Sequence, residues 1–150
     1  MRRPVLSRLL LTAVLVVTGC GTIDSQALSP SNLKIEIRSD NSVYAPEDTF
    51  SGTFTFINRS RRRIRASFPS WGQYWVDFYD DEGILRLGWS DNVGPPAVSY
   101  LELEPLGTRT DTLRIPLAGP PDSLHEGTYR VHAWVDRHED IYSETTIEVR

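Results

Sequence analysis

The sequence predicts an all-β fold: an antiparallel immunoglobulin-like β-sandwich of about eight or nine strands. From residue 32 onward, apolar and polar residues alternate with a period of two, which is the pattern of half-buried strands. Turn-forming residues separate these segments at short intervals, and no segment carries an amphipathic pattern long enough for a substantial helix. Many short strands with regular turns are typical of two packed antiparallel sheets.

The expected strands follow one another along the chain. The first has Leu33, Ile35 and Ile37 facing inward, and the second has its phenylalanines on one face. The segment "SVYAPEDTF" between them is expected to be a connection, and residues 73–89 a hairpin that turns at Asp80 to Gly83. In order, the strands are expected near 33–38, 49–58, 61–68, 73–79, 84–89, 98–104, 109–117, 128–136 and 142–149.

Gly127-Thr128-Tyr129 precedes a late strand, where the tyrosine corner of such sandwiches falls. Tyr129 is therefore expected to serve the fold rather than a ligand.

The first 19 residues have the layout of an export signal. Three arginines come first, and a short apolar stretch follows over residues 9–17. The stretch is too short to span a bilayer, which needs about 20 apolar residues. We therefore exclude residues 1–19 from the fold.

Cys20, the one cysteine of the chain, follows this segment in Val17-Thr18-Gly19-Cys20. The tetrapeptide resembles the bacterial lipobox, which implies cleavage before Cys20 and attachment of a diacylglycerol to its sulfur. The alternative is a secreted protein with an incidental or buried thiol. Residues 20–31 are then expected to be a lipidated tether and residues 32–150 the domain. Gly21, rather than aspartate, favours the outer membrane if the cell has two, by analogy with lipoprotein sorting.

The mature chain would hold 131 residues, with 13 basic and 20 acidic side chains and a formal charge of −7. A domain this acidic is not expected to bind nucleic acid. It has no glycine-rich phosphate loop, and we expect no cofactor.

Catalysis is not expected either. The sequence has no Gly-x-Ser-x-Gly elbow, and the three histidines, His125, His132 and His138, have no recognisable partner motif.

A metal site is a weaker alternative, around "HAWVDRHED". In it His132 and Asp136 share a strand face with Trp134, while His138, Glu139 and Asp140 are expected in the following turn. This spacing matches no zinc pattern, so no metal ligand is assigned.

The one basic run is "NRSRRRIR", in which Arg61, Arg63 and Arg65 lie on one strand face. These side chains would meet anionic headgroups or an acidic partner, or they would form a solvated face that pairs with neighbouring acids. The second interpretation is favoured.

Aromatic residues crowd between residues 71 and 89. In the strand "YWVDFY", alternation places Tyr74, Val76 and Phe78 opposite Trp75, Asp77 and Tyr79, so one set is expected to be partly exposed. Exposed tryptophan and tyrosine are enriched at protein interfaces. The predicted partner-binding residues, including the Pro-Pro pair of a nearby loop, are Trp71, Trp75, Tyr79, Trp89, Pro95 and Pro96. The alternative is a small core beneath that loop.

The stretch from Val43 to Val131 resembles the BsuPI-type domain, named after an intracellular proteinase inhibitor of bacilli. The matching motifs are Tyr44-Ala45-Pro46-Glu47, Phe56-Ile57-Asn58-Arg59-Ser60, Phe68-Pro69-Ser70-Trp71-Gly72-Gln73, Gly83, Trp89-Ser90 and Gly127-Thr128-Tyr129. Tyr74-Trp75-Val76 and Glu104-Pro105-Leu106-Gly107 depart from the family's Tyr-Asp-Phe and Pro-Gly-Glu. The resemblance implies an immunoglobulin-like sandwich without a cofactor, and its name implies protease inhibition.

These observations together predict a lipid-anchored, extracytoplasmic and non-catalytic binding module of the cell envelope. Its expected partners are the membrane, through Cys20, and an envelope protein, which in the inhibitor case would be a protease. A cell-surface proteinase inhibitor and a metal-binding envelope protein are the two alternatives.

Overall fold

The computed structural model describes residues 27–69, 72–91, 98–119 and 123–150. Within these ranges the chain forms strands and no helix, so the described part also contains no helix that would cross a membrane. The ten strands are β1 (Leu33–Ser39), β2 (Val43–Tyr44), β3 (Thr49–Asn58), β4 (Ile64–Phe68), β5 (Tyr74–Tyr79), β6 (Leu85–Ser90), β7 (Ser99–Leu103), β8 (Thr108–Pro116), β9 (Gly127–Val135) and β10 (His138–Val149).

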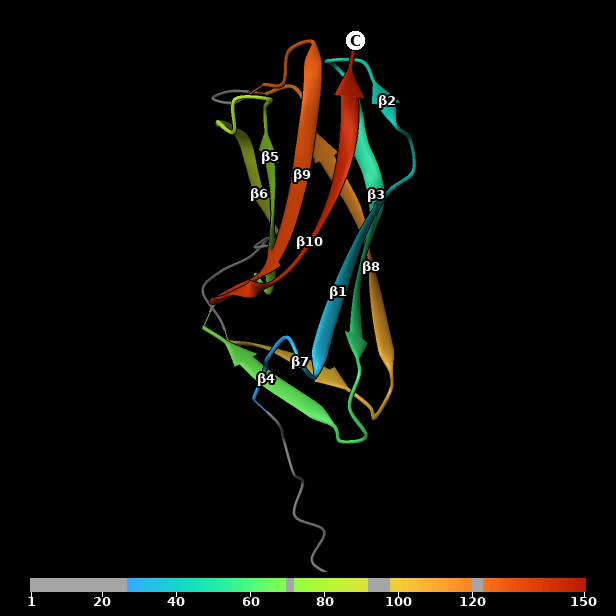
Figure 1. Cartoon of the computed structure of the whole chain (residues 1–150), viewed down its shortest axis with the longest axis vertical. Coiled ribbons are helices and arrows are strands. Elements are labelled where there is room, and N and C mark those ends of the chain that lie inside the picture. The colour runs from blue at the N-terminus through green and yellow to red at the C-terminus, as the bar shows by residue number, and fades with distance from the viewer. Residues whose placement is uncertain (1–26, 70–71, 92–97, 120–122) are drawn as a thin grey trace, which may run out of the picture.

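The strands form two facing sheets and a short ribbon. One sheet has the order β1-β3-β8, the other has the order β2-β10-β9-β5-β6, and β4 pairs with β7. All pairs are antiparallel except β2 with β10. The β4–β7 ribbon lies at one end of the sandwich, the lower end in Figure 1. The expected all-β sandwich is confirmed.

The core lies between the two sheets and is rich in aromatic side chains. Phe54 of β3 stacks on Tyr74 of β5 with ring centroids 3.9 Å apart, and Phe50 meets Phe78 edge to face at 5.4 Å. All four side chains are buried. Burying a side chain of this size contributes about 2–3 kcal/mol, so the inward alternation of β3 and β5 holds the sheets together.

Two local predictions are confirmed. The β5–β6 hairpin turns at Asp80 to Gly83, where the Gly83 amide donates to the carbonyl oxygen of Asp80 at 3.0 Å and Gly83 has a φ of 75°. The Tyr129 hydroxyl donates to the carbonyl of His125 at 3.0 Å and accepts from the His125 amide at 3.2 Å. These bonds form the tyrosine corner and fasten the segment that leads into β9.

Three strands differ from the expected bounds by more than one residue. β4 begins only at Ile64, so Arg61 and Arg63 lie in the loop before it rather than on a strand. Val43 and Tyr44 form β2 within the expected connection, because they pair in parallel with Glu148 and Val149 at the far end of the chain. A two-residue strand has no period of its own, so only this long-range pairing defines it.

The turn between β9 and β10 is also shorter than expected. His138, Glu139 and Asp140 belong to β10 rather than to the turn, because His138 pairs directly with Val135. Arg137 has a φ of 62°, a left-handed conformation that closes this tight connection. A bulge between His138 and Tyr142 separates this short start from the rest of β10.

The folded domain begins before residue 32. Leu28 is only 8% exposed and packs in the core. The side chain of Asn32 donates to the carbonyl of Ala27 at 2.7 Å, and the Leu33 amide bonds to the carbonyl of Ser29 at 2.9 Å. The segment expected to act as a tether up to residue 31 is therefore part of the fold from about residue 27.

Asn58 organises the end of the sandwich where β3 leads into β4. Its side chain is 1% exposed. The amide nitrogen donates to the carbonyls of Arg62 at 2.7 Å and Glu104 at 2.8 Å, and the amide oxygen accepts from the amide and hydroxyl of Ser60 at 2.9 and 2.8 Å. One buried side chain thereby joins the β3–β4 loop to the β7–β8 turn.

We predict that Asn58→Ala lowers the free energy of unfolding by about 2–4 kcal/mol, because several buried polar groups lose their partners at once. Chemical denaturation of the purified protein measures this change. Asn41→Ala is the matched control, since the Asn41 residue is exposed, and it should change stability by less than about 0.5 kcal/mol. Equal, small effects at both positions would contradict the role assigned to Asn58.

Candidate functional site

The outward face of the five-stranded sheet carries aromatic side chains from three strands. Side chains alternate along a strand, so the buried Tyr74, Val76 and Phe78 leave Trp75, Asp77 and Tyr79 on the opposite face. The register then sets three rows across β5, β9 and β10. We define the outer aromatic face by five residues from these rows: Trp75, Tyr79, His132, Trp134 and Tyr142.

The two tryptophans form the centre of this face. Trp75 and Trp134 are cross-strand partners whose rings lie 11° from parallel, with centroids 5.8 Å apart. The Trp134 indole nitrogen donates to Asp77 Oδ2 at 2.9 Å, and the Trp75 indole nitrogen donates to Asp136 Oδ1 at 3.2 Å. These carboxylates hold both rings in one orientation.

His132 lies beside the tryptophans and links the remaining aromatic rings. Its ring stacks on Tyr142 at 5.1 Å and meets Tyr79 edge to face at 6.3 Å. Its Nδ1 lies 2.9 Å from Oε1 of Glu144, and the Arg130 guanidinium lies 5.2 Å above the ring of Tyr79. A hollow of about 270 Å³ is lined by Tyr79, Arg130, His132, Tyr142 and Glu144.

The buried carboxyl group of Asp77 holds the Trp134 ring of the outer aromatic face by a hydrogen bond. Asp77 is 8% exposed, and burial is the main cause that raises the pKa of its carboxyl above the ordinary value of 3.8. The hydrogen bond from Trp134 acts in the opposite direction. Gly88 is the cross-strand neighbour on β6, and a Cβ there would lie 3.3 Å from Asp77 Oδ1. Gly88 therefore leaves room for this carboxyl.

The structure brings together only part of the predicted partner-binding set. Trp75 and Tyr79 lie on the outer aromatic face. Trp89 does not, because it pairs with Val76 and so points inward, where its ring lies 6.1 Å from that of Tyr74 and packs against the core. The other predicted residues, Trp71, Pro95, Pro96 and the lipidation residue Cys20, lie outside the described residues.

Three members of the face were not in the predicted partner-binding set: Trp134, Tyr142 and His132, which was considered for a metal site. Trp134 and Tyr142 come from strands far from Trp75 in sequence. Alternation along the strand already placed Trp134 on the same face as His132, so the sequence was sufficient to identify Trp134. Tyr142 could be identified only from the pairing register of β10 with β9.

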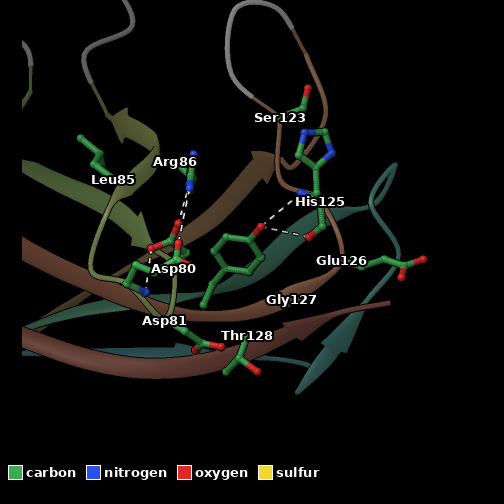
Figure 2. Close-up of a pocket in the computed structure, with 11 residues that line it drawn as sticks. Asp80, Asp81, Leu85, Arg86, Ser123, His125, Glu126, Gly127 and Thr128 are labelled. Carbon is green, nitrogen blue, oxygen red and sulfur yellow. Dashed lines mark hydrogen bonds and ion pairs between the residues drawn. The ribbon is translucent and has the colours of Figure 1, made fainter.

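A second hollow, of about 690 Å³, lies between the β5–β6 turn and the segment leading into β9 (Figure 2). Its polar groups bond mainly to one another. Asp80 pairs with Arg86 and accepts from the amides of the turn, and the hydroxyl of Tyr129 is engaged by His125. Ser123 Oγ bonds to the backbone of Gly119 at 3.1 Å. We assign these groups to the fold.

The described residues do not form a set of ligands for the metal site considered as an alternative. Among the described residues, no three side chains of the His, Cys, Asp or Glu types come together in a group able to hold an ion. His132 is instead paired with Glu144, and His138 starts β10.

No protein-family model and no curated protein matches the sequence. Among solved structures, the chain is similar to the alkylpurine DNA glycosylase AlkC of Pseudomonas fluorescens bound to DNA containing an abasic site analogue. The TM-score is 0.54 and the identity 13%, over 79% of this chain and 30% of that one. At this identity the likeness shows the fold alone, and the chain spans less than a third of the glycosylase.

Two further similarities are more distant. A β-glucosidase from Listeria innocua gives a TM-score of 0.49 at 11% identity, over 79% of this chain and 16% of that chain. Spo0M, a sporulation control protein from Bacillus subtilis, gives a TM-score of 0.43 at 13% identity, over 79% of this chain and 49% of that chain.

The raised pKa of Asp77 predicts a pH dependence of stability. A carboxyl that binds its proton more tightly in the folded state stabilises that state most below its ordinary pKa of 3.8. This contribution is lost as the pH rises through the raised value. Denaturation of the wild type and Asp77→Asn across this pH range should show a smaller loss in the variant, because burial also raises the pKa of Asp91 and that contribution remains in both proteins.

Trp134→Phe provides the second arm of this test. It removes the indole donor that favours the ionised carboxyl, so the pKa of Asp77 should rise further and the loss of stability should move to higher pH. Carbon NMR titration of the Asp77 carboxyl reads the pKa directly. A pKa at or below 3.8 in the wild type would contradict the burial argument.

Proposed function

We propose that this protein is a lipid-anchored, extracytoplasmic binding module that contacts another envelope protein through its outer aromatic face. The observation that carries the proposal is the set of aromatic rings on the solvent side of β5, β9 and β10. Their neighbours on the opposite face of the same strands supply the core.

The chemistry of the face suits a protein partner. Trp75, Tyr79 and Trp134 are half-buried and Tyr142 is 56% exposed, so each ring retains surface to offer. Tryptophan, tyrosine and arginine are the residue types enriched among the residues that dominate binding energy. The two indole rings are already held by carboxylates, so little side-chain freedom is lost on binding.

A role in binding rather than catalysis is supported by the surroundings of His132. Its Nδ1 bonds to Glu144 and its ring is held against Tyr142. Within the described residues, neither a serine hydroxyl nor a cysteine thiol hydrogen-bonds to this pair, as an activated nucleophile would require.

Cys20 supplies the attachment in this proposal. The lipobox-like segment places a thiol directly after the apolar stretch, and acyl chains on it would anchor the mature chain firmly, since each buried methylene contributes about 0.8 kcal/mol. The protein would then lie at the cell envelope, and Gly21 favours the outer membrane where two membranes exist.

Two tyrosines allow a matched test of the binding face. Tyr142 on the outer aromatic face and Tyr100 on the β4–β7 ribbon are almost equally exposed, at 56% and 53%. We predict that a photo-crosslinking amino acid at position 142, in intact cells, gives a discrete adduct with one envelope protein, and that position 100 does not.

The partner identified in this way is then purified for affinity measurement. Tyr142→Ala should weaken its binding about tenfold or more, and Tyr100→Ala should leave it unchanged. Crosslinks of equal yield at both positions, or equal affinities of the two variants, would overturn the assignment of the face.

A further inference from the structure

A second surface lies at the end of the sandwich that carries the β4–β7 ribbon. We define this basic end by Leu106 of the β7–β8 turn and by four arginines of the β3–β4 loop, which are Arg59, Arg61, Arg62 and Arg63. All five side chains are exposed. The loop and the turn are joined by Asn58 and by a bond from the Leu106 amide to the carbonyl of Ser60 at 3.0 Å. The basic end is therefore a fixed surface.

Part of the positive charge of this surface is not paired with an acidic side chain among the described residues. Arg63 pairs with Glu104 at 2.7 Å, and nearby Arg65 pairs with Glu102 at 3.0 Å, as the solvated-face interpretation predicts. Arg59 and Arg61 have no acidic partner among the described residues. In a chain of net negative charge, this end is the part that an anionic surface would attract.

Leu106 adds an apolar tip to the basic end. Its side chain is 64% exposed, and its φ of 57° is a left-handed conformation that is unfavourable for leucine. The turn is fixed by bonds from the Gly107 amide to the carbonyl of Glu104 and from the Asn58 amide to the carbonyl of Gly107, each 2.9 Å. An exposed leucine among arginines matches the boundary between headgroups and acyl chains.

The chain enters the fold at this same end. The amide of Arg59 bonds to the carbonyl of Asn32 at 2.7 Å, so the first described residues adjoin the basic loop (Figure 1). Only six residues separate Ala27 from Cys20, and the seven Cα-to-Cα steps between these two residues span at most about 25 Å when fully extended.

This reach limits how the domain can stand on a membrane. The ten residues of β3 span about 30 Å between the basic end and the opposite end. With the opposite end against the bilayer, the entry point would lie beyond the reach of the tether. The orientations that remain hold the basic end near the lipid surface.

We propose that the basic end docks on the anionic headgroups of the membrane in which Cys20 is anchored, with Leu106 inserted among them. This inference rests on the lipid attachment of the proposed function. The docked end leaves the outer aromatic face, on the side of the sandwich, accessible to a partner.

The test uses the acylated chain purified from membranes and reconstituted into vesicles. The sulfur of Cys20 is blocked by its lipid, so a cysteine introduced by Leu106→Cys carries the only fluorescent label. Asp81→Cys, in the β5–β6 turn at the opposite end, is the control position, and Arg61→Cys is a second label site if Leu106→Cys does not fold. Quenching by nitroxide-labelled lipid is measured in vesicles of phosphatidylcholine with and without phosphatidylglycerol.

We expect strong quenching at position 106 that depends on phosphatidylglycerol, and little at position 81. Arg59→Glu with Arg61→Glu should abolish the phosphatidylglycerol dependence, since each arginine near such a surface strengthens binding about fivefold. Arg38→Glu with Arg114→Glu, which changes the net charge equally away from this end, should preserve it.

Failures of the two proposals are distinguishable. An acylated chain whose quenching is the same in both vesicles, and is unaffected by the Arg59 and Arg61 changes, would overturn the docking and leave the anchor intact. That result would assign the basic end to an acidic protein surface instead. A soluble chain with an unmodified Cys20 would overturn both.

Discussion

The register between β5 and β9 is the constraint on which the rest of the structure depends. It pairs Trp75 with Trp134 and Asp77 with His132 on the solvent side, while Val76 and Phe78 meet Ala133 and Val131 in the core. A slip of one residue would exchange the two faces and bury charged and indole groups. The packing of the core therefore fixes the composition of the outer aromatic face, and the carboxylates beneath the indoles fix its geometry.

The fold was predictable wherever a strand carries its own alternation. The phenylalanines of β3, the hairpin at Asp80 and the corner at Tyr129 are local patterns, and each is confirmed. β2 was not predictable, because two residues have no period and are held by the opposite end of the chain. Leu28 was missed for a similar reason: a single apolar residue in a polar segment becomes part of the core only through tertiary packing.

The candidate surfaces were predictable only in part. Alternation within β5 identified Trp75 and Tyr79, but closeness in sequence wrongly grouped Trp89 with them, although its register on β6 turns it inward. Tyr142 joins the face through strand pairing, which sequence alone did not specify. At the basic end, the arginine run was visible, whereas the buried role of Asn58 and the entry of the chain beside Arg59 are tertiary features.

In this account, a short lipid tether, a basic end toward the bilayer and an aromatic face on the side of the sandwich act together to present a protein-binding surface at a fixed height above the membrane. Its most direct test is intact-mass spectrometry of the protein purified from membranes, beside a Cys20→Ala form. The account predicts a chain that begins at residue 20 and carries the added mass of acyl groups, absent from the variant. An unmodified chain recovered from the soluble fraction would contradict it.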